Sequence, residues 1–252
     1  MKSNKIHVYL IGWIKNLYLK TKDFFFLLFV LAIFLPFFVF GQVMQAYLLL
    51  NYQYGLLMSF IKFAVLATMG EAIGLRIKTG HYNQPGFGLL PRAVVWGLLG
   101  ITIHFAFVIF PVGVTHLLER LGLEASSTAL SSTDLTINKL FVAFSVSLVM
   151  NLVYAPVMMT MHKITDTHIL SHGGSVRALI KPIRMGQILS EINWEVQWSF
   201  VFKKTIPLFW VPAHTITFLL PEAYRVLFAA LLGIMLGVIL AVAAVMGKQN
   251  RF

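Results

Sequence analysis

Six long apolar stretches follow one another along this chain, and they constrain its fold more than any other feature. Crossing the hydrocarbon core of a bilayer takes about 20 mostly apolar residues in a helix. The chain is 58% hydrophobic and 12% charged, whereas soluble domains are about 45–50% apolar and about 25% charged. A compact soluble core cannot hide this much apolar surface. The sequence therefore predicts an all-α bundle of six transmembrane helices, at 24–48, 55–75, 93–115, 139–161, 198–220 and 223–246.

Lys and Arg are distributed unevenly over the connections between these stretches. Fourteen of them lie in the N-terminal segment, the C-terminal tail and the loops 76–92 and 162–197, against three in the other connections. Loops rich in Lys and Arg stay in the cytoplasm. We therefore expect both termini to be cytoplasmic. The fifth stretch is the weakest, because Pro207 and Pro212 interrupt it, and a re-entrant fifth stretch would put the C-terminus outside.

The domain organisation follows from this pattern. Residues 1–23 alternate Lys with apolar side chains, which is typical of an amphipathic helix in the membrane interface. The membrane bundle is expected to cover 24–247, with a cytoplasmic loop at 162–197 and a cytoplasmic tail at 248–252. The N-terminus has no pattern of organellar targeting, so we expect a multi-pass protein of a bacterial inner (cytoplasmic) membrane.

The net charge of +11 does not indicate a nucleic-acid partner. A nucleic-acid reader carries its basic residues on a soluble face, and no soluble domain remains outside the apolar stretches. Anionic lipid headgroups are the expected partners of these charges. The chain has no Cys, which excludes disulfides and zinc–thiolate sites.

Two similar segments open the third and sixth stretches. Arg92-Ala-Val-Val-Trp-Gly-Leu-Leu-Gly-Ile shares Arg, Leu, Leu, Gly and Ile with Arg225-Val-Leu-Phe-Ala-Ala-Leu-Leu-Gly-Ile. Two halves of three spans have opposite orientations, and such inverted repeats are typical of transporters. The alternative is coincidence, because Leu-Leu-Gly-Ile is common in membrane helices.

Two ionisable residues inside the second stretch are candidates for function. Charges within the membrane are costly and usually face the bundle interior or a wet cavity. Lys62 and Glu71 are nine residues apart, so they point to nearly opposite faces about 13 Å apart along the helix. Each needs its own partner on another helix, or water. For Glu71, that partner could be Arg76 or Arg92.

Three polar residues are expected near the middle of the bilayer. His104, Asn151 and His214 each lie well inside a span. Together they would form a polar layer suited to a solute path or a proton relay. The alternative is hydrogen bonding between helices that only stabilises the bundle.

Small residues four apart predict close helix contacts. Gly70 and Gly74, and likewise Gly233 and Gly237, form small-xxx-small faces that let two helices approach. The contact could lie within the subunit or between subunits of a homo-oligomer. Packing within the subunit is the preferred interpretation.

One segment has metal-like spacing. Its side chains recur on one helical face and combine imidazole with carboxylate, which suits a divalent metal. We prefer a solvated linker, because Gly173 and Gly174 end any helix there, and we expect no metal and no cofactor. No nucleophile-elbow, zinc-protease or P-loop motif occurs, so enzyme activity is not expected. The residues with the metal-like spacing are His162, Asp166, His168 and His172.

The C-terminal part contains Asn193-Trp194, Trp198 and Phe200, followed by Pro221-Glu-Ala-Tyr224-Arg225-Val-Leu. This pattern resembles the twenty-two-kilodalton peroxisomal membrane protein family. This chain has additional residues between the two parts, and six stretches where the family has four spans. The resemblance implies an organellar-type membrane protein that forms a small-solute pore and has no enzyme activity.

Together these features predict a channel or transporter for a small solute. Its path would be lined or gated by the polar residues inside the spans. The alternative is a non-catalytic structural or assembly factor that docks a partner through loop 162–197. The path residues are Lys62, Glu71, His104, Asn151 and His214.

Overall fold

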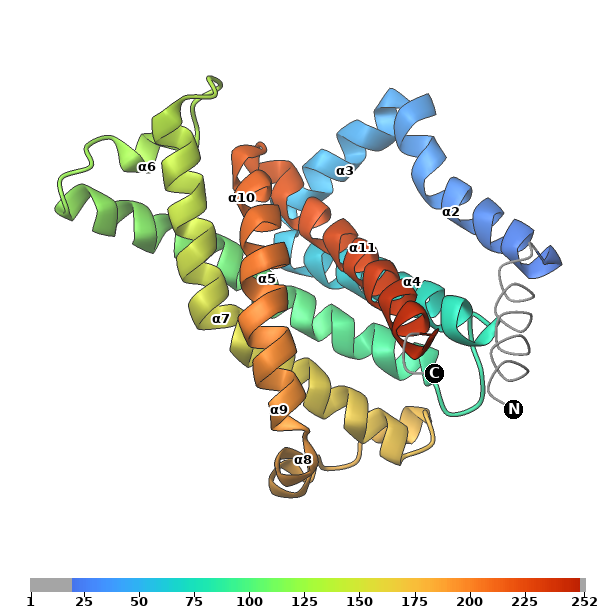
Figure 1. Ribbon diagram of the computed structural model, residues 1–252. Helices are drawn as coiled ribbons and strands as arrows, with labels where there is room; N and C mark the ends of the chain where they lie inside the picture. Colours follow the sequence, from blue (N-terminus) through green and yellow to red (C-terminus); the bar gives the residue numbers. More distant parts are fainter. Residues whose placement is uncertain (1–19, 250–252) are drawn as a thin grey trace.

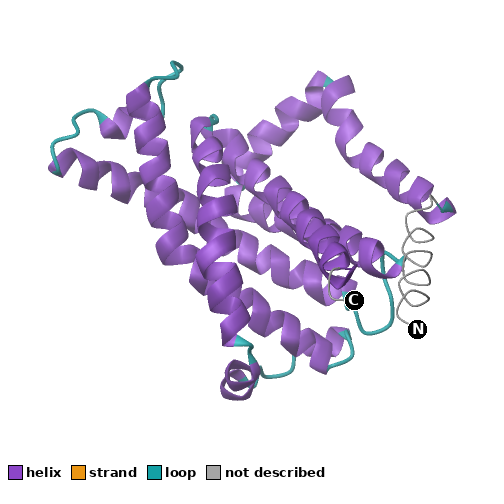
Figure 2. Cartoon of the chain, in the orientation of Figure 1, coloured by secondary structure: helices purple, strands orange, loops and turns teal. Residues whose placement is uncertain are grey.

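The computed structural model describes the backbone of residues 20–249 and their side chains as far as Val242. Most of the expected interfacial segment 1–23, and part of the tail 248–252, lie outside the described residues. The described part is helical and contains no strand, which confirms the all-α class (Figures 1 and 2).

Within residues 20–249, five helices are long and apolar enough to cross a membrane, as expected of a multi-pass membrane protein. Shorter helical elements connect them or pack beside them. The five are α2 (Thr21–Val39), α4 (Gly55–Thr79), α5 (Leu89–Arg120), α7 (Ile137–Ser171) and α11 (Glu222–Gln249). The others are α3 (Gly41–Gln53), α6 (Ser126–Ala129), η1 (Val176–Leu179), α8 (Met185–Glu191), α9 (Trp194–Val196), η2 (Gln197–Trp210) and α10 (Val211–Leu219).

The first apolar stretch differs from the single helix predicted at 24–48. It forms α2 and α3, separated by Phe40, whose backbone is extended at φ −115° and ψ 103°. Pro36 has no N–H and weakens the last turn of α2, and Gly41 begins the next helix. After the break, α3 runs back from the far tip of α2 to the start of α4 (Figure 1).

The fifth stretch differs as well, because it is two joined elements. Residues 197–210 form a π-helix, η2, which continues directly into the α-helix α10. A π-helix pairs each residue with one five positions away, and Pro207 interrupts the ordinary α-helical ladder here. Whether 198–220 crosses the membrane stays a prediction.

The helix directions follow from close contacts. In α4 and α11, Gly70 faces Ile234 and Gly74 faces Gly237, so these two helices run parallel. In α5, Gly100 faces Ser59 and Phe63 of α4, and Glu71 pairs with Arg92, so α4 and α5 are antiparallel. α7 is antiparallel to α5, since Thr102 meets Tyr154 and Arg92 meets Asp166.

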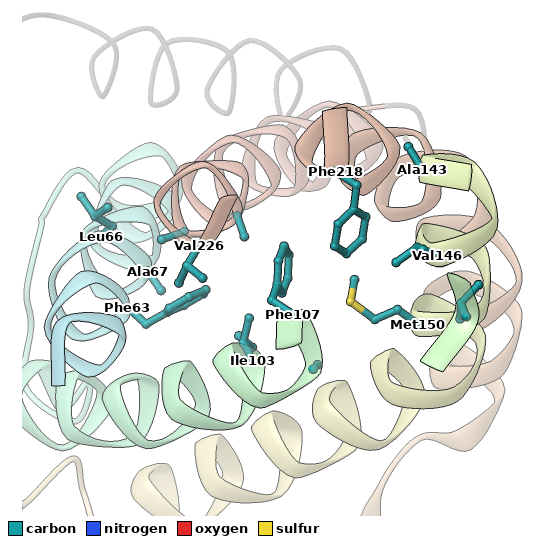
Figure 3. Close-up of a cluster of buried hydrophobic side chains, with 14 of the residues drawn as sticks. Phe63, Leu66, Ala67, Ile103, Phe107, Ala143, Val146, Met150, Phe218 and Val226 are labelled. Atoms are coloured by element: carbon teal, nitrogen blue, oxygen red, sulfur yellow. The ribbon is translucent and has the colours of Figure 1, made fainter. Parts of the chain in front are cut away.

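These directions gather several helix termini at one end of the bundle. The end of α4, the start of α5 and the end of α7 lie there, together with Lys78, Arg92 and Lys163. We call it the basic end and its opposite the far end. Between the two ends, aromatic and aliphatic side chains form the main core (Figure 3), which includes Phe63, Ala67, Ile103, Phe107, Val146, Met150, Phe218 and Val226.

α2 contacts the bundle through an ion pair at its start and through the partly buried side chains of Phe26, Val30 and Phe34. None of its side chains is buried, yet Asp23 accepts hydrogen bonds from Arg76 Nη2 at 2.6 Å and Nε at 2.8 Å. The Tyr82 hydroxyl donates to the same carboxylate at 2.9 Å. Burial, and then this hydrogen bond, raise the pKa of Tyr82 to about 12, so Tyr82 stays a donor at neutral pH.

Asp23→Asn is expected to loosen the contact between the start of α2 and α4. It removes the carboxylate that accepts hydrogen bonds from Arg76 and Tyr82, and hydrogen bonds to a charged group are stronger than those to a neutral one. Spin labels on Leu31→Cys and Ile239→Cys, introduced into this cysteine-free chain, measure the separation of α2 and α11. The distance distribution should broaden in Asp23→Asn and stay narrow in the exposed control Asp134→Asn. Equal distributions would contradict the role of Asp23.

Candidate functional site

A charged cluster at the basic end is centred on Arg92. Its Nη1 lies 2.5 Å from Glu71 Oε2 of α4, and its Nη2 forms an ion pair with Asp166 of α7. Its Nε donates to the Phe87 carbonyl at 2.7 Å, and the guanidinium lies over the Phe87 ring. One cation therefore joins α4, α5, α7 and the loop before α5.

Glu71 is further engaged through its second oxygen. Trp96 Nε1 donates to Glu71 Oε1 at 3.0 Å, and His162 Nε2 lies 3.0 Å from the same atom. The Trp96 and His162 rings are in contact, with centroids 4.4 Å apart. Of the two partners considered for Glu71, the structure selects Arg92, while Arg76 pairs with Asp23.

A second polar pair lies deeper in the bundle. The Asn151 side-chain amide and His214 Nδ1 of α10 are 3.0–3.2 Å apart. The ring of His214 lies between Phe107 and Trp210, with centroids at 5.5 Å and 5.1 Å. Trp210 Nε1 is buried without a hydrogen-bond partner in the described part of the chain. Asn151 also donates to the Ser147 carbonyl at 2.8 Å.

A cavity of about 510 Å³ links these two polar groups. Its walls come from α4, α5, α7, η2, α10 and α11. Glu71 and Arg92 lie at the basic end, Asn151 and His214 lie toward the far end, and apolar side chains line the middle. Lys78 and Lys163, both exposed, are also among its lining residues, so the cavity reaches the surface at the basic end.

Two predicted path residues lie elsewhere. Lys62 donates to Asn51 Oδ1 at 2.6 Å, and Asn51 Nδ2 contacts the Ala223 carbonyl at 3.4 Å. His104 Nδ1 lies 2.9 Å from Ser59 Oγ. Neither Lys62 nor His104 lines the cavity. Their contacts join α3, α4, α5 and α11, which is the structural alternative considered for such residues.

The four residues with metal-like spacing make separate contacts and do not form one site. The first part of their segment, 162–171, continues α7 rather than forming a loop. His162 and Asp166 join the Arg92 cluster, whereas His168 Nε2 contacts the Ala178 carbonyl at 3.0 Å. His172 Nδ1 lies 2.9 Å from the His168 carbonyl. Among the described residues, no three His, Asp or Glu side chains are arranged to hold a metal ion.

The glycine faces bring α4 and α11 together within the subunit. A Cβ on Gly70 would lie 2.8 Å from Ile234 Cα, and one on Gly237 would lie 3.2 Å from the Gly70 carbonyl. A Cβ on Gly74 would make ordinary van der Waals contacts, and a Cβ on Gly233 would have no neighbouring atom within 4 Å. Gly233 borders the cavity instead.

Arg92 and Arg225 occupy similar local positions. Each opens a long helix and donates from Nε to a carbonyl five residues earlier, at 2.7 Å and 3.0 Å. Each guanidinium also lies over an aromatic ring, Phe87 or Phe218. The two halves of the proposed repeat are packed differently, however. α2, the first helix of one half, has no buried side chain, whereas α7, the first helix of the other half, has many. The inverted repeat stays a prediction.

Trp96, His162 and Asp166 were not recognised from the sequence as partners of Glu71 and Arg92. The available signals were spacing and position. Trp96 follows Arg92 by four residues, as Asp166 follows His162, and residues four apart share a helix face. Both pairs also lie near the same end of the bundle, where opposite charges can meet.

No family model matches the chain, and neither a curated protein nor a solved structure matches it. The resemblance to the twenty-two-kilodalton peroxisomal membrane protein family therefore stays a prediction.

Proposed function

We propose that the protein is a transporter or channel that binds a small solute in the cavity between α4, α5, α7, η2, α10 and α11. The observation that carries the proposal is that Glu71, Asn151 and His214, on three different helices, line one cavity. Polar groups within membrane helices commonly mark solute paths, and transporter sites lie near the middle of the membrane.

The shape of the cavity supports access from one side. Exposed Lys78 and Lys163 lie at its mouth, whereas the stacked rings of Phe107 and Phe218, 5.1 Å apart, lie toward the far end. A site reached from one end fits a transporter in one of its alternating states. The excess of Lys and Arg in the loops at the basic end favours a cytoplasmic mouth, in a bacterial cytoplasmic membrane.

Cysteine accessibility tests the path in this cysteine-free chain. In proteoliposomes, Met158→Cys and Gly233→Cys, both lining the cavity, should react with a small charged thiol reagent applied at the basic end. Fully buried Ala143→Cys and outward-facing Leu152→Cys, 61% exposed, should not react, because a charged reagent enters neither a packed core nor lipid. Protection of both cavity cysteines would contradict the proposal.

One feature favours the alternative of a structural or assembly factor. The segment after α7 exposes Val176 and Ile180 beside Arg177 and Lys181, which suits docking to a membrane surface or a partner. Purified protein in liposomes separates the two functions. Flux of a solute without any partner supports transport. Reactive cavity cysteines with no flux across a broad solute panel favour the structural role.

A further inference from the structure

We propose that the ligand of the cavity is a single-chain amphipathic anion, an alkyl chain with a carboxylate or phosphate head group. The inference rests on the proposed solute site and names the chemistry of its ligand. It is carried by the apolar cavity wall and by the charges at the mouth.

The middle of the cavity is suited to an alkyl chain. A polar solute would lose its hydration against such a wall without regaining hydrogen bonds. The volume of about 510 Å³ lies within the range of about 300–1,000 Å³ that is typical of small-molecule sites, a size that suits one chain rather than two. The apolar wall includes Ala67, Met150, Met158, Met159, Val201 and Leu236.

The charges at the mouth favour an anion. Glu71 and Asp166 are both paired with Arg92, and Glu71 also accepts from Trp96. Lys78 of α4 and Lys163 of α7 are exposed and have no ion pair among the described residues. Arg92 balances the charge of only one of these two carboxylates, and with Lys78 and Lys163 the charged groups that line the cavity have a net charge of +1, which favours an anionic head group.

Binding of a bromine-labelled hexadecanoate tests the proposal. The full chain in neutral phosphatidylcholine nanodiscs is titrated, and quenching of tryptophan fluorescence is measured, since Trp96 and Trp210 border the cavity. We expect saturable quenching. Hexadecyl phosphate should compete, whereas hexadecyl-trimethylammonium should not, and acetate or inorganic phosphate at equal concentration should not, because they lack the chain. Shortening the chain should weaken binding by about fourfold per methylene removed.

Two pairs of variants locate the site. Lys78→Ala with Lys163→Ala should weaken binding at least about tenfold by removing charges near the head group, whereas the exposed pair Lys203→Ala with Lys204→Ala, outside the cavity lining, should not. Gly233→Leu projects a side chain into open space bordering the cavity and should abolish saturable quenching. Gly113→Leu, also with open space around it, is its control.

The proposal is overturned if the alkylammonium binds as tightly as hexadecanoate, if quenching does not saturate, or if Gly233→Leu binds normally. Its failure is distinguishable from failure of the transport proposal. Saturable binding without flux would support the proposed ligand and contradict transport. Flux of a polar solute that is blocked by labelling Met158→Cys, together with no binding of the amphiphile, would support transport and contradict the proposed ligand.

Discussion

Arg92→Met is expected to destabilise the bundle by about 3–5 kcal/mol, because it leaves two carboxylates without their cation in a low-dielectric site. The Arg92 side chain is 8% exposed, and those of Glu71 and Asp166 are each 19% exposed. One substitution therefore removes the contact that joins α4, α5 and α7. Thermal unfolding of the purified protein in detergent, followed by circular dichroism, measures the effect.

Two further variants make this prediction specific. Arg120→Met, at the exposed end of α5, should change the stability by less than about 0.5 kcal/mol. The triple variant Arg92→Met, Glu71→Gln, Asp166→Asn should recover much of the loss, since neutral partners no longer leave buried charges. If Arg92→Met unfolds no earlier than Arg120→Met, the cluster does not hold the helices together.

Gly70→Ala is expected to destabilise the protein by about 1–3 kcal/mol through overpacking. Its new Cβ would lie 2.8 Å from the Cα of Ile234, and a backbone atom cannot give way by changing rotamer. α11 must then move away from α4 along the whole contact. Gly233→Ala should have the opposite sign, because its Cβ meets nothing and Ala favours a helix over Gly by about 1 kcal/mol.

The same unfolding measurement compares the two glycine variants directly. They are matched in chemistry, and both positions lie on the long helices that meet at this contact. A lower midpoint for Gly70→Ala with an unchanged or higher midpoint for Gly233→Ala is the expected result. Equal losses at both positions would show that helix propensity or the bilayer environment, rather than the contact with Ile234, controls the effect.

Local physical chemistry was enough to predict several features. Long apolar stretches predicted the membrane helices, and the need for a counter-charge limited Glu71 to Arg76 or Arg92. Glycines spaced four apart predicted close helix contacts without naming the helices that meet, and Gly70 and Gly237 lie where α4 contacts α11. Pro207 and Pro212 marked the fifth stretch as irregular, and η2 lies there. Each of these inferences depends on neighbours in sequence or on the cost of burying charge.

The tertiary structure decided which side chains meet. His162 and Asp166, which have metal-like spacing in the sequence, contact Glu71 and Arg92 in the structure. His104 contacts Ser59, apart from the pair formed by Asn151 and His214. Lys62 contacts Asn51 and does not line the cavity. The tertiary structure also divides the first stretch at Phe40. In a bilayer the outward face of a helix is as apolar as the inward face. Hydrophobic periodicity therefore cannot show which face is buried, and the choice of neighbouring helices rests on packing between segments far apart in the chain.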